Sequence, residues 1–288
     1  MKTNNIPDNA LVRQGPDRQQ LNLIPIILIC LSLAYISLIV YIPAINVFYQ
    51  AFHKGIEPFL ANLTNPDFLS AVRITLLLAL ITVPINTIFG LCAAWSIARH
   101  QFPGRTLLLS IIDLPLSISP VVAGLMIMLL YGRQGWFGGW LQERGIDIVF
   151  AFPGMALATA FVSMPFVVRE VIPVLEETGT DQEEAARTLG ASDWQIFWRV
   201  TLPNIRWGLM YGVLLTNARA MGEFGAVSVV SGNVANTTQS LPLFVEEAYK
   251  QYDTEAAFSA AVLLALLAAV TLVIKEVLES KTKIKDKS

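Results

Sequence analysis

Residues 174–206 read VLEETGTDQEEAARTLGASDWQIFWRVTLPNIR and form a charged interval between two hydrophobic stretches. Thr180 stands three residues before Glu183, and Ser192 stands three residues before Gln195. Each pair matches a capping box, in which a hydroxyl side chain and a carboxyl or amide side chain satisfy free N–H groups at a helix start. The interval therefore predicts two short helices rather than a spacer.

A glycine and a proline set the limits of these two helices. We expect the first over about 181–189, ended by Gly190, because glycine most easily adopts the left-handed conformation that ends a helix. The second is expected to start at Ser192 and to end before Pro203, which disfavours helical geometry at Leu202. Aromatic side chains recur in it at helical spacing and form a stripe on one face: Trp194, Phe197 and Trp198. The result is a bent, partly apolar helical pair.

The order Glu184-Ala185-Ala186, three residues, Gly190, nine residues, then Val200-Thr201-Leu202-Pro203 resembles the EAA loop of permease subunits of bacterial ATP-binding-cassette (ABC) importers. Val200 stands where isoleucine is more usual. In that family the loop lies in the cytoplasm and docks into a groove on the ATPase subunit. The resemblance implies these coupling residues: Glu184, Ala185, Ala186, Gly190, Trp194, Phe197, Leu202 and Pro203. The alternative interpretation is an amphipathic helical hairpin on the membrane surface.

The composition is that of a membrane protein. The 288 residues are 54% hydrophobic and 15% charged, and the mean hydropathy is +0.56. A net charge of -2 argues against a nucleic-acid partner. Cys30 and Cys92 lie inside apolar runs, where we expect them to behave as small hydrophobic residues.

Six apolar runs are long enough to cross a bilayer, which needs about 20 helical residues. They are 21–48, 74–97, 106–131, 149–168, 207–230 and 256–274. The sequence therefore predicts an all-α integral membrane protein, resembling a type I ABC importer, with a six-helix permease domain over 21–274. Residues 1–20 and 275–288 are expected to be tails. No small-residue cleavage site follows the first run, so we expect it to remain as a membrane helix.

The basic residues favour one orientation. Lysine and arginine near span ends are retained in the cytoplasm. Most of the 20 lysines and arginines fall in the two tails, in the turn at 99–105 and in the interval 169–206. We therefore predict both termini and the coupling loop on the cytoplasmic side of the inner membrane.

Motifs for nucleotide or metal chemistry are missing from the sequence. It contains no Gly-x4-Gly-Lys-Ser/Thr phosphate loop, no dinucleotide fingerprint and no metal-spaced His or Cys cluster. We expect no catalytic residue, metal or cofactor in this chain. ATP would be bound and hydrolysed by a partner subunit.

The fifth run contains two charged residues, Arg219 and Glu223, and charge inside hydrocarbon costs about 2.5–3.5 kcal/mol per residue. Their spacing of four puts them on one helix face, where they can pair. One interpretation is that this face, with Thr216 and Asn217, lines a translocation path in which Arg219 attracts an anion. The other is a structural ion pair, and both can hold together.

Asp113 lies in the third run, about eight residues from its inner end, and is expected near the cytoplasmic mouth. Ser117 and Ser119 flank a proline-induced break there, and they are candidates for the path or gate, although helix packing is the favoured explanation of the break. A second break is expected at Ser163-Met164-Pro165. Small residues of the fifth run are expected at a close helix contact: Ala218, Gly222, Gly225 and Ala226.

Four segments narrow the resemblance to the sulfate and molybdate permease group, and within it to W-type subunits of sulfate/thiosulfate importers. They are 113–124, 219–227, 228–232 and 241–249. The resemblance implies a heterodimer with a T-type permease, two ATPase subunits, a periplasmic sulfate-binding protein, and sulfate or thiosulfate as substrate. A molybdate or tungstate permease and a self-contained secondary transporter are the alternatives, and a membrane enzyme is a more distant one.

Overall fold

The computed structural model describes residues 23–285, and these residues contain helices and no strand. The chain divides into two compact units, Met1–Asn46 and Val47–Ser288. The first unit contains α1 (Leu23–Ile36), the π-helical η1 (Ser37–Tyr41) and the start of α2 (Ile42–Phe52). α2 continues into the second unit. The predicted tail 1–20 lies outside the described residues.

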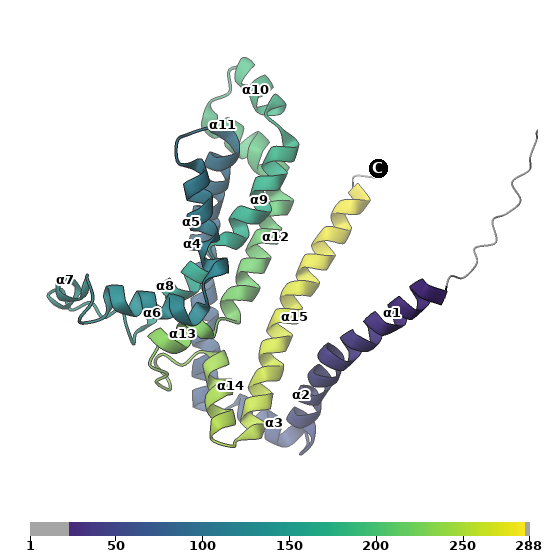
Figure 1. The fold of residues 1–288 in the computed structure, drawn as a ribbon, viewed down its shortest axis with the longest axis vertical. Coiled ribbons are helices and arrows are strands. Elements are labelled where there is room, and N and C mark those ends of the chain that lie inside the picture. The colour runs from purple at the N-terminus through teal and green to yellow at the C-terminus, as the bar shows by residue number, and fades with distance from the viewer. Residues whose placement is uncertain (1–22, 286–288) are drawn as a thin grey trace, which may run out of the picture. The chain divides into compact units, whose positions relative to one another are not determined.

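The second unit contains the remaining helices (Figure 1). They are α3 (Ile56–Leu63), α4 (Pro66–Arg99), α5 (Arg105–Ser117), α6 (Pro120–Tyr131), α7 (Gly138–Gln142), α8 (Phe152–Ser163), α9 (Pro165–Thr178), α10 (Asp181–Thr188), α11 (Asp193–Ile196), the π-helical η2 (Phe197–Thr201), α12 (Leu202–Met221), α13 (Gly225–Val230), α14 (Leu241–Lys250) and α15 (Thr254–Lys285).

Four helices among the described residues are long and apolar enough to cross a membrane: Pro25–Phe52, Pro66–Arg99, Phe152–Thr178 and Thr254–Ile274. The predicted first, second, fourth and sixth spans lie largely within them. The fourth helix continues ten residues beyond its predicted end at Val168, to Thr178.

The third predicted span is not one straight helix. It consists of α5 and α6, which meet at 112°. Ile118 and Ser119 between them have ψ angles of 138° and 135°, and a residue before proline is pushed into this extended region. Pro120 then opens α6 from its first turn, where the missing N–H costs nothing. If this bent pair counts as one span, the described residues contain five.

The fifth predicted span, 207–230, is also divided. α12 begins earlier, at Leu202, and ends at Met221, and a break at 222–224 separates it from α13. α12 is 20 residues long but too polar to be counted as a span by composition.

Pro203 does not end the helix before it, and that prediction is wrong. The chain passes from α11 through η2 into α12, and Leu202 has helical angles of -61° and -43°. The Leu202 N–H donates to Phe197 O, five residues back. A π turn of this kind changes the position of the carbonyl that would collide with the proline ring. η1 is a π turn of the same kind before Pro43, where the Ile42 N–H donates to Ser37 O, five residues back.

A core cluster joins α4, α5, α9 and α12. Its least exposed members, at 1% or below, are Ala94, Ile97, Ile112, Val167, Val168, Val171, Leu175 and Ile205. Close backbone approach supports this packing. A Cβ added to Gly212 of α12 would lie 2.9 Å from Val167 Cα, and one added to Gly90 of α4 would lie 2.7 Å from Val167 Cβ. These contacts hold the base of the 174–206 interval.

The predicted close contact of small residues is confirmed for α13 and not for Gly222. A Cβ added to Gly124 of α6 would lie 2.7 Å from Ala226 O, and one added to Gly225 would lie 2.9 Å from Pro120 Cβ. At Gly222 the nearest atom is Ala218 O in the preceding turn, at 3.4 Å. The partner of α13 is therefore α6.

Within the second unit, α10 and α11 lie at one end, and α14 and α3 lie at the opposite end (Figure 1). α9 and α12 run side by side between these ends and pack against α4. The interval 174–206 and the connection 231–253 are thus on opposite sides of the bundle.

Candidate functional site

The interval 174–206 contains two short helices, as predicted, and we call it the coupling loop. Gly190 follows α10 with a φ of +85°, which confirms the left-handed bend. Ser192 and Gln195 form a complete capping box: Ser192 Oγ accepts from the Gln195 N–H at 3.4 Å, and Gln195 Oε1 accepts from the Ser192 N–H at 3.0 Å. The start of α11 is therefore fixed by local contacts.

The capping box predicted at Thr180 is wrong. Thr180 makes no side-chain cap for α10, and its hydroxyl donates instead to Glu184 Oε1 at 2.8 Å. Glu183, its expected partner, is engaged elsewhere. The contact of Glu183 with Arg99 replaces the local contact that Glu183 would make in a capping box with Thr180.

Arg99 and Glu183 form the centre of a nearly buried clamp, in which Glu183 also bonds to Thr201 and Arg99 also bonds to the Leu175 carbonyl. Arg99 Nη2 and Nε donate to Glu183 Oε1 at 3.0 and 3.2 Å, and Nε also reaches Oε2 at 3.1 Å. Thr201 Oγ1 donates to the same carboxylate at 2.9 Å, and Arg99 Nη1 donates to Leu175 O at 2.8 Å. The Arg99 and Glu183 side chains are only 8% and 15% exposed. Because charge-assisted hydrogen bonds of this kind are among the strongest in proteins, the clamp ties α10 to α4, α9 and η2.

The free end of the coupling loop is apolar and exposed. Leu189 is 88% exposed and Trp194 is 69% exposed, and Trp198 also faces outward. Trp194 stacks on Phe197 at a centroid distance of 6.2 Å and meets Trp198 edge-on at 5.5 Å. Large apolar side chains exposed together mark a surface that binds a partner protein or a membrane.

The remaining predicted coupling residues also lie at or near the surface. Glu184, Ala185, Gly190 and Pro203 are exposed, and Ala186, Phe197 and Leu202 are partly buried. The motif residues thus form the outer side of the loop, and the clamp forms its inner side.

Arg219 and Glu223 form the predicted ion pair, at 2.8 Å between Nη2 and Oε2. The other carboxylate oxygen of Glu223 accepts from the Ala226 N–H at 2.8 Å, so this side chain also caps the start of α13. The Glu223 side chain is 1% exposed, whereas that of Arg219 is 31% exposed. The carboxylate is a buried structural group that bridges the break between α12 and α13.

Thr216 and Asn217 differ in their surroundings. Thr216 is fully buried, and within the described part of the chain its Oγ1 has no hydrogen-bond partner. Asn217 is partly buried and its Nδ2 lies 3.5 Å from Met221 Sδ.

Asp113 pairs with Arg169 of α9. Its Oδ1 accepts from Arg169 Nε at 2.8 Å, and the two side chains are 40% and 57% exposed. Ser117 and Ser119, at and just beyond the end of α5, are exposed. Arg169 begins the interval predicted to lie in the cytoplasm, and its pairing could not be predicted because 56 residues separate the partners.

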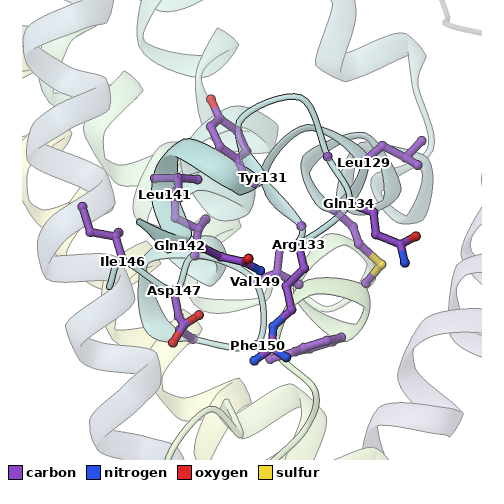
Figure 2. A pocket seen from close by; sticks show the side chains of 16 residues that line it. Leu129, Tyr131, Arg133, Gln134, Leu141, Gln142, Ile146, Asp147, Val149 and Phe150 are labelled. Carbon is purple, nitrogen blue, oxygen red and sulfur yellow. The ribbon is translucent and has the colours of Figure 1, made fainter. Parts of the chain in front are cut away.

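A cavity of about 920 Å³ lies between α6, α7 and the segment leading to α8 (Figure 2). Arg133, Gln142 and Asp147 are among its lining side chains, and no residue predicted for the path or the coupling loop lines it. Across the described residues no group of three His, Cys, Asp or Glu side chains is placed to hold a metal ion. Cys30 and Cys92 are unpaired and exposed.

The family of binding-protein-dependent transport system inner membrane components matches residues 86–284. The chain belongs to this family. This permease is therefore a non-catalytic, multi-pass inner-membrane subunit of an ABC importer, a class that works with an ATPase and a binding protein.

Individual relatives agree with the family. The permease is 68% identical over 256 residues to the sulfate transport system permease protein CysW of Synechocystis sp., covering 89% of this chain and 93% of that one. It is 41% identical to CysT of Escherichia coli over 82% of this chain and 86% of that one. The resemblance to W-type sulfate permeases is thus confirmed.

Solved structures show the same fold. A bacterial ABC transporter involved in alginate import aligns with a TM-score of 0.74 over 90% of this permease and 96% of that chain, at 18% identity. At this identity the likeness concerns the fold alone. It confirms that the permease has the all-helical architecture of ABC importer membrane subunits.

Proposed function

We propose that this permease forms one half of the translocation path of an ATP-driven importer of sulfate and thiosulfate. Its partners would be a T-type permease, two copies of an ATPase, and a periplasmic sulfate-binding protein that delivers the substrate. Similarity to proteins named CysW and CysT supports both the substrate and the pairing of two related permeases.

The observation on which this proposal rests is the construction of the coupling loop. Its outer side presents Leu189, Trp194 and Trp198, and its inner side is clamped through Glu183 to α4, α9 and η2. Such a loop can receive a partner on one side and pass its displacement to three helices on the other. The mechanism would be alternating access, in which ATP closes the ATPases, the loop moves with them, and the path opens outward.

Six spans with both termini in the cytoplasm fit the fold. Beside the four apolar helices, the bent pair α5 and α6 would provide one span, and α12 would provide another. α12 contains 20 residues, which is about 30 Å at 1.5 Å per residue and matches the hydrocarbon thickness. The coupling loop and the connection 231–253 lie at opposite ends of the bundle, as that topology requires (Figure 1).

Arg219 would present positive charge to the passing anion. Glu223 pairs with its guanidinium, and the Arg219 side chain remains 31% exposed. Asn217, two residues before Arg219, would add polarity to this part of the path, whereas Thr216 is fully buried and would not reach it. Asp113, Ser117 and Ser119 would line a second part.

The test uses proteoliposomes in which the ATPase side of the complex faces outward and the binding protein is enclosed in the lumen. In this orientation the importer moves sulfate out of the lumen. The complete complex is reconstituted, ATP is added outside, and export of bound sulfate from the lumen is followed. We expect transport to require ATP, to persist without a proton gradient, and to be inhibited by thiosulfate but not by equimolar molybdate. Molybdate inhibition equal to that of thiosulfate, or transport driven by a proton gradient alone, would contradict the proposal.

A further inference from the structure

Two ion pairs connect α5 and α9, and α5 contributes the arginine to one pair and the carboxylate to the other. Arg105 Nη2 of α5 lies 3.2 Å from Glu176 Oε1 of α9, and Asp113 Oδ1 of α5 lies 2.8 Å from Arg169 Nε of α9. Arg105 precedes Asp113, whereas Glu176 follows Arg169, so the two helices run antiparallel. The pairs thus form the two ends of a ladder along one α5–α9 contact.

The inner pair lies deep in the helices. Asp113 is eight residues from Arg105, which opens α5, and this is about 12 Å along the axis at 1.5 Å per residue. Arg169 is seven residues from Glu176, about 10 Å along α9 by the same measure. The two estimates agree, and they place Asp113 and Arg169 within the depth of one membrane leaflet from the coupling-loop end.

Both side chains of this inner pair are open, at 40% and 57% exposed. A charged side chain facing lipid costs about 2.5–3.5 kcal/mol at the bilayer centre, and charged residues within membrane segments almost always face the bundle interior or a water-filled cavity. The exposed side of this pair therefore does not face lipid.

α5 has two exposed faces of opposite character. Polar residues recur at helical spacing on one face: Thr106, Ser110, Asp113 and Ser117. Leu107, Ile111 and Leu114 recur with the same spacing one residue on, and they are exposed to 64%, 50% and 41%. One face suits lipid or an apolar partner, and the other suits water.

We propose that the polar strip formed by Ser110, Asp113, Ser117 and Arg169 lines the water-filled cytoplasmic part of the translocation path, where Arg169 meets the transported dianion. This assignment rests on the proposed function. Asp113 neutralises part of the Arg169 charge, so the dianion is attracted without being retained, as a conducting path requires.

Cysteine accessibility tests the assignment. Cys30 and Cys92 are replaced by serine, and single cysteines are introduced as Ser110→Cys and Ser117→Cys on the polar face, with Leu107→Cys and Ile111→Cys as matched positions on the apolar face. The assembled complex in lipid nanodiscs is treated with a negatively charged methanethiosulfonate. We expect the two polar-face cysteines to react at least tenfold faster than the two apolar-face cysteines. When no nucleotide is bound to the ATPase, saturating sulfate should slow the reaction of the polar-face cysteines.

A second measurement separates contact with the anion from packing. Arg169→Gln combined with Asp113→Asn keeps the shape of the pair and removes both charges, and Arg169→Lys keeps the cation. We expect the neutral pair to raise the sulfate concentration for half-maximal transport severalfold while the maximal rate changes less, and Arg169→Lys to recover most of the loss.

Each outcome has a distinct meaning. Equal reaction rates on the two faces, or a neutral pair with unchanged sulfate dependence, in a complex that transports sulfate would overturn this assignment alone. A parent complex that assembles but does not transport sulfate would overturn the proposed function, and this assignment with it.

Discussion

Arg99 Nη2 lies 3.0 Å from Glu183 Oε1, and this contact joins the last turn of α4 to the first turn of α10. The pair is almost buried, and Thr201 and the Leu175 carbonyl complete it. In the mechanism that we propose, the motif residues of the coupling loop meet the ATPase, and this clamp makes the loop move together with the spans.

Arg99→Ala should uncouple the importer. Removing one member of a nearly buried pair costs roughly 3–5 kcal/mol, since the other charge remains without compensation. We expect stimulation of ATPase activity by the loaded binding protein to fall at least tenfold, with basal hydrolysis retained. Arg187→Ala is the control, because its pair with Asp193 is 65% and 81% exposed and such pairs contribute about 0–1 kcal/mol. Equal effects of the two substitutions would show that the clamp has no special role.

Gly190→Val should abolish stimulated ATPase activity while the subunit still inserts into the membrane. The left-handed conformation costs an L-residue roughly 1–2 kcal/mol, and a Cβ at Gly190 would meet nothing within 4 Å, so the effect is one of the backbone alone. Gly190→Asn should keep most coupling, because asparagine tolerates this region. Gly104→Val is a matched control with a φ of +96° and open space outside the loop. Full coupling in Gly190→Val would refute the prediction.

Ser192→Ala should loosen the start of α11. Loss of a serine N-cap costs about 1 kcal/mol. We expect faster amide hydrogen exchange over 193–198 and a small fall in coupling, both reversed by Ser192→Asp. Unchanged exchange would mean that the continuous helix from α11 to α12 holds this turn without its cap.

Substitutions at Arg219 and Glu223 should distinguish a role of Arg219 in transport from a role of Glu223 in assembly. Glu223→Ala removes the cap of α13 and one half of a buried pair, so we expect poor assembly, measured by recovery of the complex in detergent. The double variant Arg219→Gln, Glu223→Gln leaves no buried charge and should assemble, but it should transport sulfate several times more slowly. Normal transport by an assembled double variant would leave the pair with a structural role only.

Local signals predicted the coupling loop well. The Ser192 capping box, the left-handed Gly190 and the helical pair all follow from neighbouring residues, and each is present. Thr180 has the same spacing to Glu183 as Ser192 has to Gln195, yet Glu183 bonds to Arg99, 84 residues away. No local pattern distinguishes these two cases, because the difference lies in which helix end packs nearby.

The proline-induced break before Pro120 was predicted and is present, whereas the helix end predicted before Pro203 is absent. Before Pro120 the chain bends by 112°, whereas before Pro203 and Pro43 a π turn lets the helix continue. The residues before all three prolines have similar local preferences, so packing decides between a bend and a π turn. Likewise the pairing of Arg169 with Asp113, 56 residues away, cannot be identified from spacing.

The most direct test of the account is affinity purification of the tagged permease from membranes, followed by an ATPase assay with sulfate-loaded binding protein. The account predicts co-purification of a second permease and an ATPase. Hydrolysis by the parent complex should be stimulated by the loaded binding protein and not by the sulfate-free protein, and hydrolysis by the Gly190→Val complex should be stimulated by neither. A permease that purifies alone and transports sulfate in vesicles without ATP would contradict it.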